Sequence, residues 1–155
     1  CESDKPGYAQ CLAREADQRR AVAEDRSLLN RTIDETLRFE PTGPHVARYV
    51  AKDFDAYGRT VPAGSAMLLL FGAANRDPRR YHDPDTFDIG RDNISHVTFG
   101  KGLHYCLGAN LARLEGRVAL DELLNRWPEW GLDYDSMQLA PTSTVRGWEK
   151  LRITF

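Results

Sequence analysis

The sequence is poor in cysteine, in long apolar runs and in net charge. Three cysteines in 155 residues are too few and too scattered for a disulfide framework or a paired zinc site. The longest apolar run, residues 66–71, is far shorter than a membrane-spanning helix. A formal net charge of −2 gives no electrostatic sign of a nucleic acid or a membrane as a partner. We therefore expect a single domain that binds neither a nucleic acid nor a membrane. We also expect it to lie in a reducing, cytoplasmic compartment.

The residues that carry chemistry gather in one loop, 99–108, which reads Phe-Gly-Lys-Gly-Leu-His-Tyr-Cys-Leu-Gly. Cys106 precedes a long amphipathic pattern, so its thiolate would lie at a helix N-terminus, where backbone N–H groups favour negative charge. A thiolate in that position is suited to bind a metal or act as a nucleophile; the alternative is a buried structural cysteine. The glycines of the loop, Gly100 and Gly102 among them, would let a large flat ligand approach the backbone closely.

The spacing Phe-x-x-Gly-x-His-x-Cys-x-Gly resembles the haem-binding signature of the cytochromes P-450, the haem-thiolate monooxygenases, in their soluble bacterial form. The resemblance implies that Cys106 is the axial iron ligand of haem b (iron protoporphyrin IX). It also implies that the backbone N–H groups of Leu107 and Gly108 donate to the sulfur. His104 would bind a haem propionate, and Phe99 would cover the sulfur side of the ring.

A second match to the family lies on the helix expected over residues 28–39. Glu35 and Arg38 are three residues apart and therefore share one face of that helix. By itself the spacing indicates a surface ion pair of little consequence. The resemblance implies instead a buried pair with a structural role, which supports the haem pocket. Many members add an arginine where this chain has threonine, so the third partner stays open between Arg91 and His96.

Further roles follow from the resemblance alone. Arg48, in the first strand after that helix, would bind a haem propionate, since a guanidinium suits a carboxylate; otherwise it is a solvated arginine at a sheet edge. Two segments would line the substrate pocket, with Thr42, His45, Val46, Thr144 and Val145. Three cations would form a docking patch for an electron donor unless they are merely solvated: Lys101, Arg113 and Arg117.

The expected fold is mainly α with small antiparallel β-sheets. Apolar periodicity predicts two short helices over 8–25 and longer ones at 28–39 and 108–125, and strands are expected near 46–52, 65–71, 130–134 and 151–155. An apolar stripe of Leu107, Leu111, Leu114 and Val118 runs along the last of these helices, and Leu120, Leu123 and Leu124 continue its apolar surface. Residues 66–71 are apolar at every position, which is typical of a strand covered on both faces. Residues 75–98 are expected to form an irregular meander.

One part of the family pattern has no match. In the family a long helix carrying an acid and an alcohol delivers protons to bound O₂, and it precedes the Glu-x-x-Arg helix. No such pair occurs in residues 1–30, and the sequence lacks an initiator methionine. We therefore expect residues 1–155 to be the C-terminal haem-binding portion of a longer domain, whether as a fragment, a truncated product or half of a split protein. By themselves they should hydroxylate nothing.

Three functions are compatible with these residues. The first is a haem-thiolate monooxygenase that inserts one atom of O₂ into a small organic substrate, with electrons from a ferredoxin- or flavodoxin-type donor. The second is a non-catalytic haem-binding or scaffold module of the same fold. The third is a metal site built from Cys106, His96 and His104, which lacks a second nearby Cys/His pair.

Overall fold

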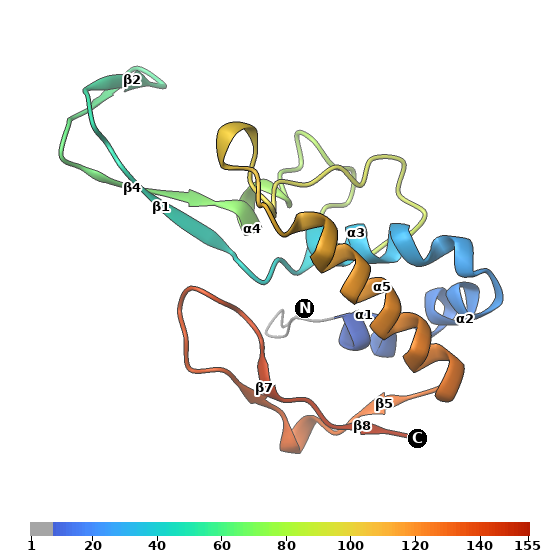
Figure 1. The fold of residues 1–155 in the computed structure, drawn as a ribbon. Coiled ribbons are helices and arrows are strands. Elements are labelled where there is room, and N and C mark those ends of the chain that lie inside the picture. Colours follow the sequence, from blue (N-terminus) through green and yellow to red (C-terminus); the bar gives the residue numbers. More distant parts are fainter. Residues whose placement is uncertain (1–7) are drawn as a thin grey trace.

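The computed structural model describes residues 8–155, so Cys1 lies outside the described residues. Helices occupy the first quarter of the described chain and recur near its middle and in its last third (Figure 1). They are α1 (Tyr8–Arg14), α2 (Ala16–Glu24), α3 (Leu29–Phe39), the short α4 (Phe71–Ala74) and α5 (Ala109–Arg126), with 3₁₀ turns η1 (Arg26–Leu28), η2 (Gly102–His104) and η3 (Tyr134–Ser136). The predictions of two short helices over 8–25 and of helices at 28–39 and 108–125 are confirmed.

The strands form antiparallel sheets of two strands each. The pairs are β1 (His45–Tyr49) with β4 (Ala66–Leu70), β2 (Phe54–Ala56) with β3 (Arg59–Val61), β5 (Gly131–Leu132) with β8 (Ile153–Thr154), and β6 (Gln138–Leu139) with β7 (Trp148–Lys150). The fold is thus mainly helical with small sheets, as predicted. The β6–β7 pair was missed because strands of two or three residues are too short to show an alternating pattern.

The hydrophobic core lies where the helices meet. It joins Leu12 of α1, Val22 of α2, Ile33 of α3, and Leu120 and Leu124 of α5, all of them buried. Burial of a side chain of this size contributes about 1.5–3 kcal/mol, so these contacts hold α5 across α3. The crossing of α5 over α3 is visible in Figure 1.

The apolar surface predicted along α5 faces this core only toward the C-terminal end of the helix, where Leu120 and Leu124 are buried and Leu123 packs against the core. Leu111, Leu114 and Val118 are each about half exposed, at 59%, 48% and 48%, and Leu107 before the helix is fully exposed. The other buried positions of α5 are Ala109 and Gly116. The helix therefore has two apolar faces, and the packed one is the face that brings small residues close to α3.

The expectation that residues 66–71 are covered on both faces is wrong for the described residues. Exposure alternates along β4, and Leu68 and Leu70 remain more than half exposed. Successive side chains of a strand point to opposite faces, and β4 pairs with one neighbour, β1, in a two-stranded sheet. One face of this sheet therefore stays open in the described chain.

Glu35 and Arg38 form a bidentate pair inside the fold. Arg38 Nε donates to Glu35 Oε2 at 2.7 Å and Nη2 donates to Oε1 at 2.8 Å, and both side chains are 0% exposed. Arg38 Nη1 also donates to the backbone carbonyls of Asn75 and Pro84, each at 2.9 Å. The pair thereby ties the irregular segment 75–98 to α3.

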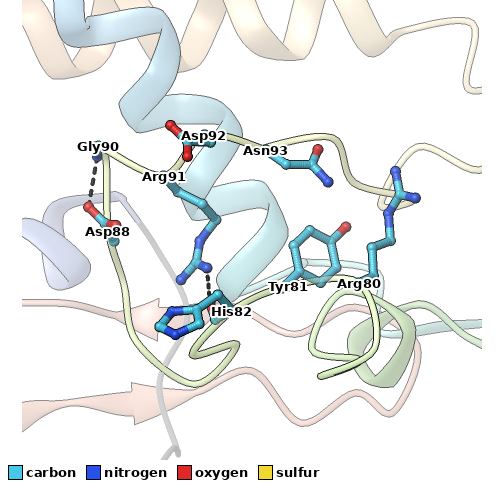
Figure 2. A pocket seen from close by; sticks show the side chains of 8 residues that line it. All are labelled: Arg80, Tyr81, His82, Asp88, Gly90, Arg91, Asp92 and Asn93. Carbon is cyan, nitrogen blue, oxygen red and sulfur yellow. Dashed lines mark hydrogen bonds between the residues drawn. The ribbon is translucent and has the colours of Figure 1, made fainter.

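Arg91 is the third member of this network. Its Nε lies 3.4 Å from Glu35 Oε1, and its Nη2 donates to the carbonyl oxygens of Asp83 and Thr86. Figure 2 shows Arg91 pointing toward the backbone of His82, at a pocket of about 330 Å³. At position 86, where many family members carry an arginine, the backbone carbonyl accepts from Arg91 instead. Of the two candidates left open by the sequence, the geometry selects Arg91.

We predict that Arg38→Ala lowers the free energy of unfolding by about 3–5 kcal/mol, because the Glu35 carboxylate is then buried without its partner. A matched control is Arg20→Ala, since Arg20 pairs with Asp17 at the same three-residue spacing but in solvent. That change should cost at most about 1 kcal/mol. Urea unfolding followed by circular dichroism measures both, and equal losses would contradict the structural role.

Candidate functional site

A cavity of about 740 Å³ lies between the β1–β4 sheet, α4 and the loop that carries Cys106. Its volume is in the range of small-molecule and cofactor sites. The lining residues come from segments far apart in sequence: Thr42, Gly43, Val46, Arg48, Leu69, Leu70, Phe71, Ala74, Val97, Thr98, Phe99, Gly100, Lys101, His104 and Cys106. Most of them present apolar atoms, and a thiol stands among them.

Backbone hydrogen bonds close the cysteine loop on itself. The N–H of Cys106 donates to the carbonyl of Phe99 at 2.8 Å, and the N–H of Tyr105 donates to Gly102 at 3.0 Å. Gly100 and Gly102 have φ of +73° and +69°, and a Cβ at Gly100 would meet the carbonyl oxygen of His104 at 3.2 Å. Glycine is required there because other residues rarely adopt that backbone conformation.

Cys106 is exposed, and its sulfur lies next to the start of α5. Gly108 is the N-cap of that helix, and a Cβ placed on Gly108 would stand 4.0 Å from the cysteine Sγ. The predicted position at a helix N-terminus is therefore confirmed. The donation from the N–H groups of Leu107 and Gly108 to a bound thiolate stays a prediction.

Asn75 anchors the cysteine loop to the buried pair. Its side chain is 0% exposed; Nδ2 donates to Thr98 Oγ1 at 2.8 Å and Oδ1 accepts from the N–H of Val97 at 2.9 Å. Thr98 Oγ1 in turn donates to the carbonyl of Leu37 in α3 at 2.6 Å. Since Arg38 binds the carbonyl of the same asparagine, the loop and α3 share one hydrogen-bonded junction. Sequence reasoning assigned Asn75 no role.

The charged groups that line the cavity are basic. Arg48 projects from β1, Lys101 and His104 belong to the cysteine loop, and no carboxylate is among the described lining residues. Arg48 Nη1 donates to the carbonyl of its neighbour Ala47 at 2.9 Å, which leaves further guanidinium N–H groups for a ligand. The cavity is therefore suited to a largely apolar ligand that carries negative charge.

The structure brings most of the predicted site residues together. Cys106, His104, Arg48, Phe99, Gly100, Thr42, Val46 and also Lys101 line the cavity. Gly102, Leu107 and Gly108 belong to the same loop without lining it. His45, Thr144 and Val145 are not among the lining residues, although the N–H of Arg146 donates to the carbonyl of Thr42 at 2.6 Å. Their substrate-lining role stays a prediction.

Two of the three predicted docking cations lie on α5. Arg117 is exposed, whereas Arg113 is half-buried and forms an ion pair with Asp34 of α3 at 2.8 Å. The same carboxylate faces His96 at 3.4 Å. Among residues 8–155, no group of three His, Cys, Asp or Glu side chains is placed to hold a metal ion, so the site proposed from Cys106, His96 and His104 is not formed.

Comparison with known proteins gives a family match that includes both the cysteine loop and the buried Glu35/Arg38 pair. The family model for cytochrome P450 matches residues 12–138. The chain belongs to the cytochrome P450 family. The biotin biosynthesis cytochrome P450 of Bacillus subtilis is 39% identical over 145 residues, which make up 94% of this chain and 37% of that protein. The vitamin D(3) 25-hydroxylase of Pseudonocardia autotrophica is 43% identical over 141 residues, 89% of this chain and 35% of that protein.

Solved structures of P450 proteins share the fold. CYP164A2 of Mycobacterium smegmatis in its ligand-free state superposes with a TM-score of 0.90 at 42% identity, over 96% of this chain and 38% of that one. P450BioI in complex with hexadec-9Z-enoic acid ligated acyl carrier protein gives 0.88 at 39% identity, over 94% and 38%. The chain thus spans little more than a third of these P450 proteins. None of the helices in the described part of this P450 chain is both long and apolar enough to cross a bilayer.

The thiols of Cys11 and Cys106 should differ sharply in their rates of alkylation, because Cys11 is buried and Cys106 is exposed. Burial, reinforced by the negative charge of Glu40, raises the pKa of Cys11 to about 12, so roughly 10⁻⁴ of it is thiolate at pH 8. In the haem-free chain, iodoacetamide at pH 8 should modify Cys106 and leave Cys11 intact. Peptide mass spectrometry distinguishes them, and the urea-unfolded chain, in which both react, is the control. Equal modification of both in the folded chain would contradict the placement.

Proposed function

We propose that this P450 chain belongs to a haem-thiolate monooxygenase in which Cys106 is the axial ligand of a haem b iron. The enzyme inserts one atom of O₂ into a small organic substrate. One observation carries the proposal: a single cavity joins an exposed thiol at a helix start to apolar walls and to cationic side chains. Relatives of this chain include a P450 monooxygenase and hydroxylases, which supports the reaction class.

The lining residues fit the chemistry of a haem. A haem has a flat apolar ring and two propionate carboxylates, and it needs a ligand for its iron. Leu69, Phe71 and Phe99 supply apolar walls, whereas Arg48 and His104 supply donors for carboxylates. The thiol of Cys106 stands in the same cavity, so every part of the cofactor has a matching group.

Six of the residues that line the cavity have a defined task in this proposal. When bound, the haem supplies oxygen activation, which thiolate ligation favours. Cys106 acts as a thiolate ligand held in place by the closed loop. Arg48 and His104 orient the propionates through charge-assisted hydrogen bonds. Phe99 keeps water from the sulfur side, and residues Thr42 and Val46 contact the substrate.

We further propose that residues 1–155 form the C-terminal haem-binding portion of a longer P450 domain. The partial coverage of the relatives supports this, as do the uncovered apolar faces of α5 and β4. The remaining part would cover those faces and supply the acid and the alcohol that deliver protons to bound O₂. The 155 residues alone should therefore bind substrate poorly and catalyse no hydroxylation.

The electron donor and the location extend the same proposal. A ferredoxin- or flavodoxin-type protein would dock on the side of Cys106, where Lys101 and Arg117 offer positive charge. Arg113 is engaged with Asp34 and is less free for that role. The small number of cysteines favours a cytoplasmic enzyme.

The decisive test is the absorption spectrum of the reduced, carbon monoxide-bound protein. In the haem-loaded protein, thiolate ligation should give a strongly red-shifted Soret band. Cys106→Ala should abolish that band, and Cys11→Ala should retain it because Cys11 is buried away from the cavity. A haem-loaded wild type without the shifted band would contradict the proposal. A shifted band without turnover in the complete protein would favour a non-catalytic haem-binding module.

A further inference from the structure

Arg113 of α5, Asp34 of α3 and His96 form a cluster of polar side chains next to the cysteine loop. We propose that Arg113 and Asp34 are positioning residues for the Cys106 loop and together set the electrostatic potential at the sulfur. This inference rests on the proposed function, because it concerns the thiolate as an iron ligand. It gives Arg113 a role inside the protein in place of the docking role predicted from the sequence.

The pair joins two helices at a partly buried position. Arg113 Nε donates to Asp34 Oδ1 at 2.8 Å, with side-chain exposures of 32% and 35%. His96, whose side chain is only 3% exposed, brings its Nε2 to 3.4 Å from the same carboxylate oxygen. The side chains of the ion pair are about two-thirds shielded from water, and the carboxylate of Asp34 has two partners, Arg113 and His96. Such a pair is held more firmly than an exposed one.

Arg113 also contacts the loop at two residues. Its guanidinium lies over the ring of Phe99, 4.7 Å from the centroid, and its Nη1 donates to the hydroxyl of Tyr105 at 3.2 Å. The carbonyl of Phe99 accepts the N–H of Cys106, and Tyr105 is the residue before Cys106. The arginine therefore fixes one side chain at each end of the turn that carries the sulfur, with a cation–π contact and a hydrogen bond.

Both members of the pair are ionised at neutral pH. Burial of Asp34 raises its pKa, but the hydrogen bonds from His96 and Arg113 outweigh this effect and hold the pKa below its usual range. For Arg113, burial lowers the pKa, and the hydrogen bonds to Asp34 and Tyr105 more than compensate, so the pKa is raised. A full positive charge is thus placed against the Phe99 ring, and Asp34 partly neutralises it.

These charges act on the iron–thiolate unit in opposite directions. Reduction adds one electron to that unit, and a nearby positive charge favours the reduced form whereas a negative charge disfavours it. Removal of the Arg113 charge should make the reduction potential more negative. Removal of the Asp34 charge should make it more positive, since the arginine is then uncompensated. A purely structural role would not produce shifts of opposite sign.

The experiment compares variants of the haem-loaded full-length protein by spectroelectrochemistry. Arg113→Gln should shift the reduction potential downward. Asp34→Asn should shift it upward, and this change leaves the shape of the side chain almost unaltered while it removes the charge. Arg113→Lys should retain most of the wild-type potential because it keeps the charge. Arg126→Gln is the control, since Arg126 lies at the exposed far end of the same helix and pairs with Glu122. It should leave the potential unchanged.

The outcomes separate this inference from the proposed function. The red-shifted band of the reduced carbon monoxide complex is recorded for every variant, and a wild type that binds no haem or lacks this band overturns both. If the wild type has the band but Asp34→Asn and Arg113→Gln shift the potential in the same direction, or not at all, the inference alone is overturned. Should Arg113→Gln fail to fold, the sign of the Asp34→Asn shift still decides.

Discussion

One buried carboxylate, that of Glu35, organises the fold beyond α3. Removing such a carboxylate and two guanidinium groups from water costs several kcal/mol for each ion, and only good geometry offsets that cost. Here Arg38 binds both carboxylate oxygens, and Arg91 approaches the same group. The remaining guanidinium N–H groups bind carbonyls of the irregular segment 75–98, which has no strand or long helix of its own to satisfy them. Arg38 and Arg91 thus bind backbone carbonyls that regular secondary structure would otherwise satisfy.

The cysteine loop depends on this support through Asn75. The backbone carbonyl of Asn75 binds Arg38, and its side chain binds Val97 and Thr98, which lead directly into the loop. Arg113 and Asp34 also connect the loop to α5 and α3. Two separate sets of contacts therefore support the loop that carries Cys106, so the position of its sulfur does not depend on the loop's glycines alone. A cysteine held in this way is suited to the role of haem ligand that we propose for it.

Sequence reasoning found the parts of this site that are encoded locally. The spacing around Cys106 and the Glu35/Arg38 pair identified the family, and apolar periodicity located the long helices. Contacts between distant segments could not be predicted, because no sequence pattern around Asn75 or Asp34 indicates a partner on another element. The apolar surface of α5 was only partly covered for a related reason: periodicity shows that a helix has an apolar face, but not which element covers it. The same limit explains the open face of β4.

We propose above that Cys106 supplies a sulfur ligand to a haem iron in this cavity. X-ray absorption at the iron K-edge of the haem-loaded protein tests it most directly, because sulfur and nitrogen scatter differently and at different distances. We expect one sulfur scatterer in the first coordination sphere of the wild-type iron and none in Cys106→Ala. An iron surrounded only by nitrogen and oxygen in the wild type, with haem present, would contradict it.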